Sequence, residues 1–125
     1  MSLPAPLLSG RAPISAYGRG GFRIGGIEHA GSILMLPDGV YAWPVDTVAQ
    51  LSVDVLAPVF DRGPSIGFLI LGTGATQIFP DAELRRHFAG IGLALEAMDT
   101  GAACRTCNIL LAEERIFAAG LIALS

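Results

Sequence analysis

The fold class of this chain is decided by residues 66–74, which read IGFLILGTG, and by residues 93–101, which read LALEAMDTG. Each segment is an apolar run that stops at a turn of small residues, a pattern typical of a buried strand. Between them, residues 81–89 read DAELRRHFA and predict a helix, because Pro80 lies near its start and Gly90 near its end. The order strand, helix, strand predicts a βαβ unit.

The end of the chain extends this pattern. Residues 102–113 predict a second helix, with Asp99 or Thr100 as its N-cap and residues 109–111 on its apolar face. Residues 116–124 read IFAAGLIAL, and this nearly continuous apolar run predicts a last strand in the centre of the sheet.

The first part of the chain predicts antiparallel strands. Residues 1–13 contain Pro4, Pro6 and Pro13 and are expected to form an extended tail or edge segment, which leaves residues 14–125 as one globular domain. Short strands are expected at residues 14–17, 22–24, 27–29, 32–36 and 40–43. Residues 25–26, both glycine, predict a hairpin turn, and Ser52 predicts the N-cap of a helix at 53–60. We expect a mixed sheet with helices packed on it, plus an antiparallel layer from this first part.

Composition excludes several functions. The chain has 125 residues, of which 52% are hydrophobic and 15% charged, so it can bury a core without disulfides or metals. All eight basic residues are arginine, which rules out a Schiff-base lysine or a phosphate-loop lysine. The arginines are scattered and the net charge is -3, so we expect no nucleic-acid partner.

Targeting signals are not evident in the sequence. The longest apolar runs are interrupted well short of the roughly 20 residues of a membrane-spanning helix, so no transmembrane segment is predicted. Residues 1–8 read MSLPAPLL and lack the basic start of a signal peptide. The expected location is therefore the cytoplasm, where Cys104 and Cys107 would be reduced.

Two motifs, taken together, carry a resemblance to a known family. Residues 68–80 read FLILGTGATQIFP, residues 95–106 read LEAMDTGAACRT, and residues 108–113 read NILLAE. They resemble a family of small single-domain proteins of bacteria and archaea that includes a mitochondrial assembly factor for respiratory complex I, the NADH dehydrogenase. The resemblance covers almost the whole chain after about Pro13.

The resemblance implies a fold and a kind of function. The implied fold is α/β with a mixed, α+β-like character: a three-layer single domain with a central mixed β-sheet, packed helices and an N-terminal antiparallel β layer. The bacterial members have no established biochemical activity, whereas the mitochondrial member binds other proteins during complex assembly. Relatives usually carry an aromatic residue where this chain has Cys107, and this departure argues against a redox role common to the family.

Candidate binding residues gather in the two turns, because ligands of open α/β sheets bind beyond the strand ends. They are Gly72, Thr73, Gly74, Gln77, Asp99, Thr100, Cys104 and Arg105. Asp99 is a candidate general base and Arg105 a candidate clamp for a carboxylate or phosphate, although a helix cap and an ion pair explain the same residues. The turn at 72–74 lacks the third glycine of a dinucleotide fingerprint, since residue 77 is Gln.

Cys104 and Cys107 form a C-x-x-C at the start of a predicted helix. A reactive dithiol is one interpretation, and two small buried residues on a helix face are the other. A zinc site would need two further ligands, and His29 and His87 are far apart in sequence. We therefore predict no metal and no cofactor.

Three hypotheses follow. In the first, the chain is a non-enzymatic interaction or assembly factor whose partner is a protein, such as a respiratory-complex subunit or another assembly factor. In the second, it is a small-molecule-binding protein or an enzyme with a pocket between residues 72–77 and 99–108, where Thr73, Asp99 and Arg105 converge. The third is the redox dithiol. The residues form no recognised catalytic set, which favours the first, and a homodimer is compatible with a small apolar domain.

Overall fold

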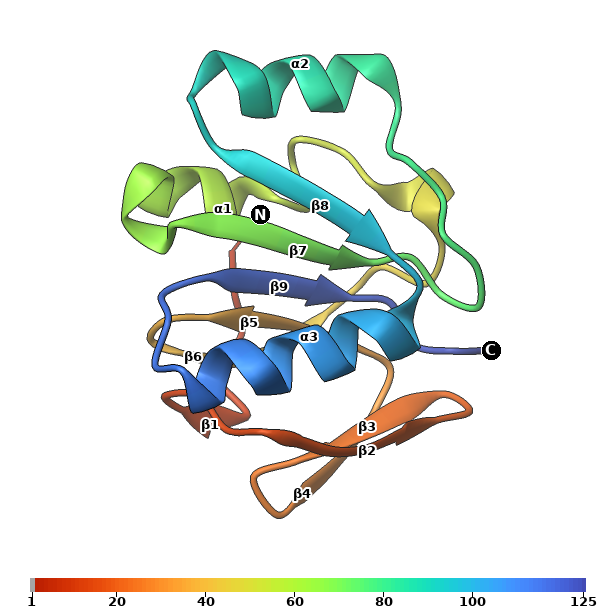
Figure 1. Cartoon of the computed structure of the whole chain (residues 1–125). Coiled ribbons are helices and arrows are strands. Elements are labelled where there is room, and N and C mark those ends of the chain that lie inside the picture. The colour runs from red at the N-terminus through yellow and green to blue at the C-terminus, as the bar shows by residue number, and fades with distance from the viewer. Residues whose placement is uncertain (1) are drawn as a thin grey trace.

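Two β-sheets and three α-helices make up the computed structural model, which describes residues 2–125 (Figure 1). The six strands of the larger sheet follow the order β1-β6-β5-β9-β7-β8. These strands are β1 (Leu8–Ser9), β5 (Ser32–Leu36), β6 (Gly39–Trp43), β7 (Phe68–Gly72), β8 (Ala94–Met98) and β9 (Ala118–Leu121). β7 runs parallel to both β8 and β9, whereas the remaining pairs are antiparallel, so the sheet is mixed.

The smaller sheet has three antiparallel strands in the order β2-β3-β4. They are β2 (Ile14–Gly18), β3 (Gly21–Ile24) and β4 (Ile27–Ala30). Gly25 and Gly26 both have positive φ and form the predicted two-residue turn between β3 and β4. Three of the five strands predicted in the first part of the chain form this antiparallel layer, whereas those at 32–36 and 40–43 pair instead within the larger sheet.

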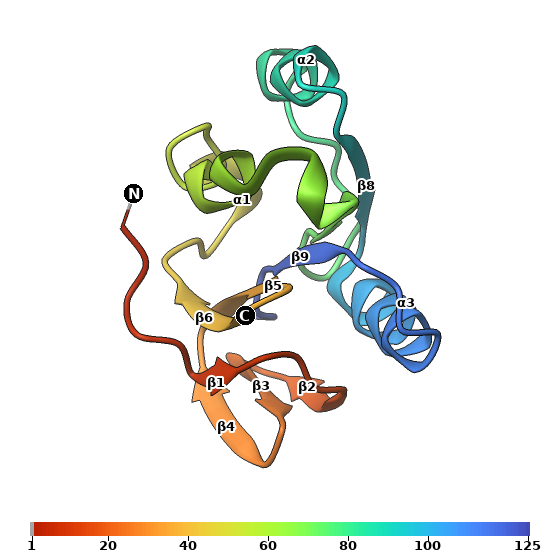
Figure 2. The same cartoon turned by 90° about the vertical axis from the view of Figure 1, so that its left-hand side faces the viewer.

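Helices α1 (Ala57–Arg62) and α2 (Ala82–Gly90) lie on one face of the larger sheet, and α3 (Thr100–Ala112) lies on the other (Figure 2). Two 3-10 turns, η1 (Val48–Gln50) and η2 (Gly63–Ile66), are also present. Leu34 packs with α1 and α2 in one core cluster, whereas its neighbour Ile33 packs with α3 and the smaller sheet in a second cluster. Alternate strand residues thus fill both cores, and the molecule has three layers, as expected.

The prediction of Asp99 as the N-cap of α3 is confirmed, and Asp81 caps α2 in the same way. Asp81 accepts a hydrogen bond from the Leu84 amide at 2.8 Å, and Asp99 accepts one from the Ala102 amide at 2.8 Å. Strand β9 lies between β5 and β7, which confirms that the last strand is central.

Two predictions about local structure are wrong. The helix expected at 53–60 begins only at Ala57, because Pro58 suits the first turn of a helix but not its middle. On α3, Leu110 is buried but Ile109 is 60% exposed, and the buried face carries small residues instead. The reason is close packing: a Cβ on Gly72 would lie only 3.2 Å from the Cβ of Ala103.

Candidate functional site

The turn after β7 is held from inside by two threonine hydroxyls. Thr100 Oγ1 accepts from the Gly74 amide at 2.8 Å and donates to the Ile122 carbonyl at 2.7 Å. Thr73 Oγ1 donates to the Thr76 carbonyl at 2.6 Å and accepts from the Ile78 amide at 3.0 Å. Both threonines are buried, so these hydrogen bonds fix the shape of the turn and favour a structural role for the two side chains.

The charged candidates make contacts in different directions. The Asp99 carboxylate caps α3, whereas Arg105 extends toward the smaller sheet and donates to the Tyr17 hydroxyl at 3.2 Å. Gln77 donates from Nε2 to the Ala97 carbonyl of β8 at 2.8 Å. The structure therefore brings Thr73 and Thr100 to the same turn, while Asp99 and Arg105 make their contacts elsewhere.

The two cysteines lie in the core between α3 and the larger sheet. Cys104 is 2% exposed and Cys107 fully buried, and both are free thiols. Burial raises the pKa of each thiol to about 12, well above the range of a reactive thiolate. This environment supports the structural interpretation of the C-x-x-C. Among the described residues, no group of three or more His, Cys, Asp or Glu side chains could hold a metal ion.

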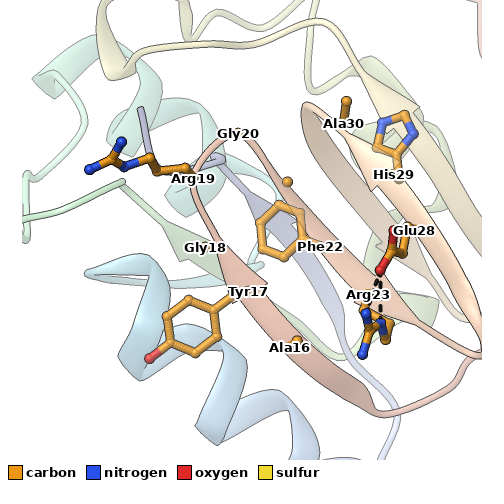
Figure 3. Close-up of a pocket in the computed structure, with 11 residues that line it drawn as sticks. Ala16, Tyr17, Gly18, Arg19, Gly20, Phe22, Arg23, Glu28, His29 and Ala30 are labelled. Atoms are coloured by element: carbon orange, nitrogen blue, oxygen red, sulfur yellow. Dashed lines mark hydrogen bonds and ion pairs between the residues drawn. The ribbon is translucent and has the colours of Figure 1, made fainter.

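A groove of about 540 Å³, lined by both charged and apolar residues, crosses the smaller sheet (Figure 3). Arg23 of β3 forms an ion pair with Glu28 of β4, and this contact lowers the pKa of the Glu28 carboxyl. The side chain of Arg19 points away from that pair, whereas His29 lies beside Glu28, on the side of the groove away from Arg19. Both side chains of this pair are largely exposed to water, so the ion pair contributes little to stability.

A second groove, of about 500 Å³, lies between α2 and β8. Its lining is apolar except for one arginine. The lining residues are Phe79, Pro80, Arg85, Phe88, Ala89, Gly92, Leu93, Ala94, Leu95 and Ala97. Phe79 is 67% exposed and its neighbour Ile78 45% exposed, so an apolar surface continues from the groove. Such a surface is typical of a site that binds another molecule.

The elements around this groove are firmly anchored. Phe88 of α2 is buried against the sheet, and its ring lies 4.7 Å from that of Phe60 in α1. β8 pairs only with β7 and is therefore an edge of the larger sheet (Figure 1). The groove is thus bounded on one side by unpaired strand backbone.

Sequence reasoning missed this groove. Phe79 lies between a predicted strand and a predicted helix, and it becomes a neighbour of Ala94 and Ala97 only through folding. One signal was present: Phe79 precedes Pro80 in a loop, where a large apolar side chain has no partner nearby in sequence.

Comparison with known proteins identifies the family. A family model described as a protein of unknown function (DUF498/DUF598) matches residues 14–122. The chain belongs to this family. Its relative from Danio rerio, named NADH dehydrogenase (ubiquinone) 1 alpha subcomplex assembly factor 3, is 37% identical over 109 residues, which cover 87% of this chain and 63% of that protein. The chain thus spans about three fifths of the length of such curated relatives.

Two bacterial relatives are similar to this chain over nearly their whole length. An uncharacterized protein of Rhodobacter capsulatus is 31% identical, with 94% of this chain and 89% of that protein covered. A crystal structure described as an outer membrane protein from Bartonella henselae superposes with a TM-score of 0.87 at 39% identity, covering 94% of this chain and 99% of that one. In the described part of this chain, no helix is long and apolar enough to cross a membrane.

Proposed function

We propose that this member of the DUF498/DUF598 family is a non-enzymatic assembly factor that acts by binding a protein. Family relatives named as NADH dehydrogenase assembly factors support this proposal. The partner would then be a subunit, or another assembly factor, of a respiratory NADH dehydrogenase. Because the relatives are longer than this chain, the proposal concerns the shared domain.

One observation carries the proposal: Phe79 is largely exposed beside an apolar groove at an open sheet edge. Aromatic side chains in such positions contribute strongly to protein interfaces. In contrast, the hydroxyls of Thr73 and Thr100 are occupied by internal hydrogen bonds, and the Asp99 carboxylate caps its own helix. The groove therefore has more support as a binding site than the pocket expected beside residues 72–77.

Affinity purification from the native source at native abundance, followed by mass spectrometry, tests this function. We expect stoichiometric recovery of NADH dehydrogenase subunits or their assembly factors with the tagged chain. Phe79→Ser should abolish this recovery. Ile109→Ser is the matched control, because Ile109 is a similarly exposed apolar residue that lies on α3, away from the groove. Equal recovery with both variants would show that the groove is not the binding site.

A clean preparation without any protein partner would contradict the proposal as a whole. In that case the next measurement would be a search for a co-purifying small molecule by mass spectrometry of the denatured protein, with Asp99→Ala and Arg105→Ala as variants. Retention of a small molecule that depends on both side chains would support the alternative, a ligand site between residues 72–77 and 99–108.

A further inference from the structure

We propose that the groove binds an extended apolar segment of the partner protein, which adds to β8 as a seventh strand and carries one acidic residue facing Arg85. This inference rests on the proposed protein-binding function and names the chemistry of the bound segment.

The backbone of β8 offers unpaired hydrogen-bonding groups on the groove side. The Thr73 amide donates to the Met98 carbonyl at 2.9 Å, so the main chain of Met98 faces β7. Main-chain groups of alternate residues point to opposite sides of a strand, which directs those of Leu95 and Ala97 away from β7. The hydrogen bond from Gln77 to the Ala97 carbonyl agrees with this direction, because Gln77 lies on the side of β8 that has no neighbouring strand.

An exposed row of N–H and C=O groups favours an extended peptide as the ligand. Only an extended main chain presents its own C=O and N–H groups at the same spacing along the strand. A lipid or a compact apolar ligand would leave these groups unpaired. Gln77 forms a hydrogen bond with only one of these backbone groups, the Ala97 carbonyl. Because the Gln77 side chain is exposed, an added strand can displace it.

The side chains of the groove select apolar residues at alternate positions. Leu95 packs with the same core cluster as Leu69 and Leu71, and Leu95 and Ala97 both line the groove. An added strand places every second side chain over the face on which these two residues lie. The remaining side chains of the strand would face the exposed side of β8, where Glu96 lies.

Charge complementarity defines the acidic residue. Arg85 is the one charged residue among those that line the groove. Its Nε donates to the Pro80 carbonyl at 3.1 Å, and Arg85 has no ion pair with any other described residue. A carboxylate on the bound segment would form an ion pair with this guanidinium.

One way of pairing a second copy of this chain with the edge is disfavoured. Antiparallel pairing of two β8 strands about a twofold axis between Leu95 and Ala97 would place the two Glu96 side chains opposite each other. Like charges directly opposite each other across a strand pair are destabilising.

Binding of synthetic peptides, measured by NMR on the isotope-labelled chain, tests the proposal. The probes are capped heptapeptides with valine at the odd positions and threonine between them, in which aspartate replaces each valine in turn. We expect at least one to bind, to shift the amide signals of Leu95 and Ala97, and to slow their hydrogen exchange. Failure of all the peptides to bind would overturn the proposal.

N-methylated versions of the binding peptide provide the matched control for strand addition. Methyl groups on the amides of one edge should weaken binding at least about tenfold, whereas methyl groups on the other edge should leave it unchanged, because only one edge pairs with β8. Equal effects of the two versions would overturn strand addition.

Arg85→Gln tests the charge. It should weaken binding of the aspartate peptide and leave unchanged the binding of a peptide with asparagine at that position. Arg86→Gln is the control, since Arg86 is the next residue of α2 and does not line the groove. An equal loss with both variants would overturn the role of Arg85.

The two proposals fail in different ways. If native purification recovers a partner that depends on Phe79 while no peptide binds, strand addition is overturned and the assembly-factor function stands. If the chain alone forms a dimer in which Leu95 and Ala97 are protected from exchange, the edge is occupied by a second copy, and strand addition by a partner is overturned.

Discussion

The side chain of Asn108 in α3 forms two hydrogen bonds with the main chain of Ile14 in β2. Its Oδ1 accepts from the Ile14 amide at 2.8 Å, and its Nδ2 donates to the Ile14 carbonyl at 2.9 Å. The carboxamide thus pairs with β2 as a neighbouring strand would. It satisfies this end of an edge strand and fastens the smaller sheet to α3.

Replacement of Asn108 should therefore loosen the smaller sheet. Asn108→Leu removes both hydrogen bonds at a half-buried site and should lower the free energy of unfolding by about 2 kcal/mol. Urea unfolding followed by circular dichroism measures this change. Asn108→Asp keeps the acceptor for the Ile14 amide but places a second acceptor oxygen against the Ile14 carbonyl, so it should also destabilise the fold at neutral pH. An aspartate variant as stable as the original chain would contradict the pairing role.

Thr100 should matter for stability more than its small size indicates. Thr100→Val preserves the shape of the side chain but leaves the Gly74 amide and the Ile122 carbonyl without their partner. We expect a loss of about 2 kcal/mol in unfolding free energy, because buried unpaired groups are costly. Thr100→Ser keeps the hydroxyl and should lose less. If valine were tolerated as well as serine, the two hydrogen bonds would not be what fixes the turn.

The stability of the fold should depend on pH through Asp38. The Arg62 guanidinium, with help from the Tyr41 hydroxyl, lowers the pKa of the Asp38 carboxyl below its ordinary value. The ionised form is favoured in the folded state, so this stabilisation is present above about pH 4, the ordinary pKa of aspartate, and is lost as the pH falls through the lowered value.

Asp38→Asn should consequently lower the stability at pH 7 and have progressively less effect as the pH falls below about 4. Denaturant unfolding of both proteins across this range measures the difference. The effect should be modest, because Asp38 is half exposed to solvent. Asp46→Asn, at another exposed position, is the control. A difference that grows toward low pH would contradict the assignment.

The two cysteines should be unreactive in the folded protein. Because burial raises the pKa of both thiols to about 12, almost no thiolate is present at neutral pH. A maleimide reagent should label both slowly in buffer and rapidly in denaturant. One thiol that reacts quickly under native conditions would revive the dithiol hypothesis.

Local signals allowed much of the fold to be predicted. Asp99 caps α3 because its carboxylate reaches an amide three residues along the chain. Gly25 and Gly26 form the hairpin turn because glycine adopts positive φ without steric cost. The mixed sheet and the central position of β9 likewise follow from apolar runs that can be recognised in the sequence.

Contacts between residues far apart in the sequence could not be predicted from local signals. Asn108 and Ile14 are 94 positions apart, and nothing near either one indicates their pairing. Ile109 was expected in the core because it is apolar, but close packing of α3 on Gly72 gives the buried face to small residues. The groove beside β8 depends on where α2 packs on the sheet, which no local pattern in the sequence indicates.

The central position of β9 affects how the chain can fold while the ribosome synthesises it. β9 joins the antiparallel strands β5 and β6 to the parallel pair β7 and β8, yet it is synthesised after all of them. Until residues 118–121 emerge, the two halves have no shared strand and both expose the edges that β9 will cover. The larger sheet therefore cannot form completely until β9 has been synthesised. A chaperone that shields those edges during translation would favour correct folding.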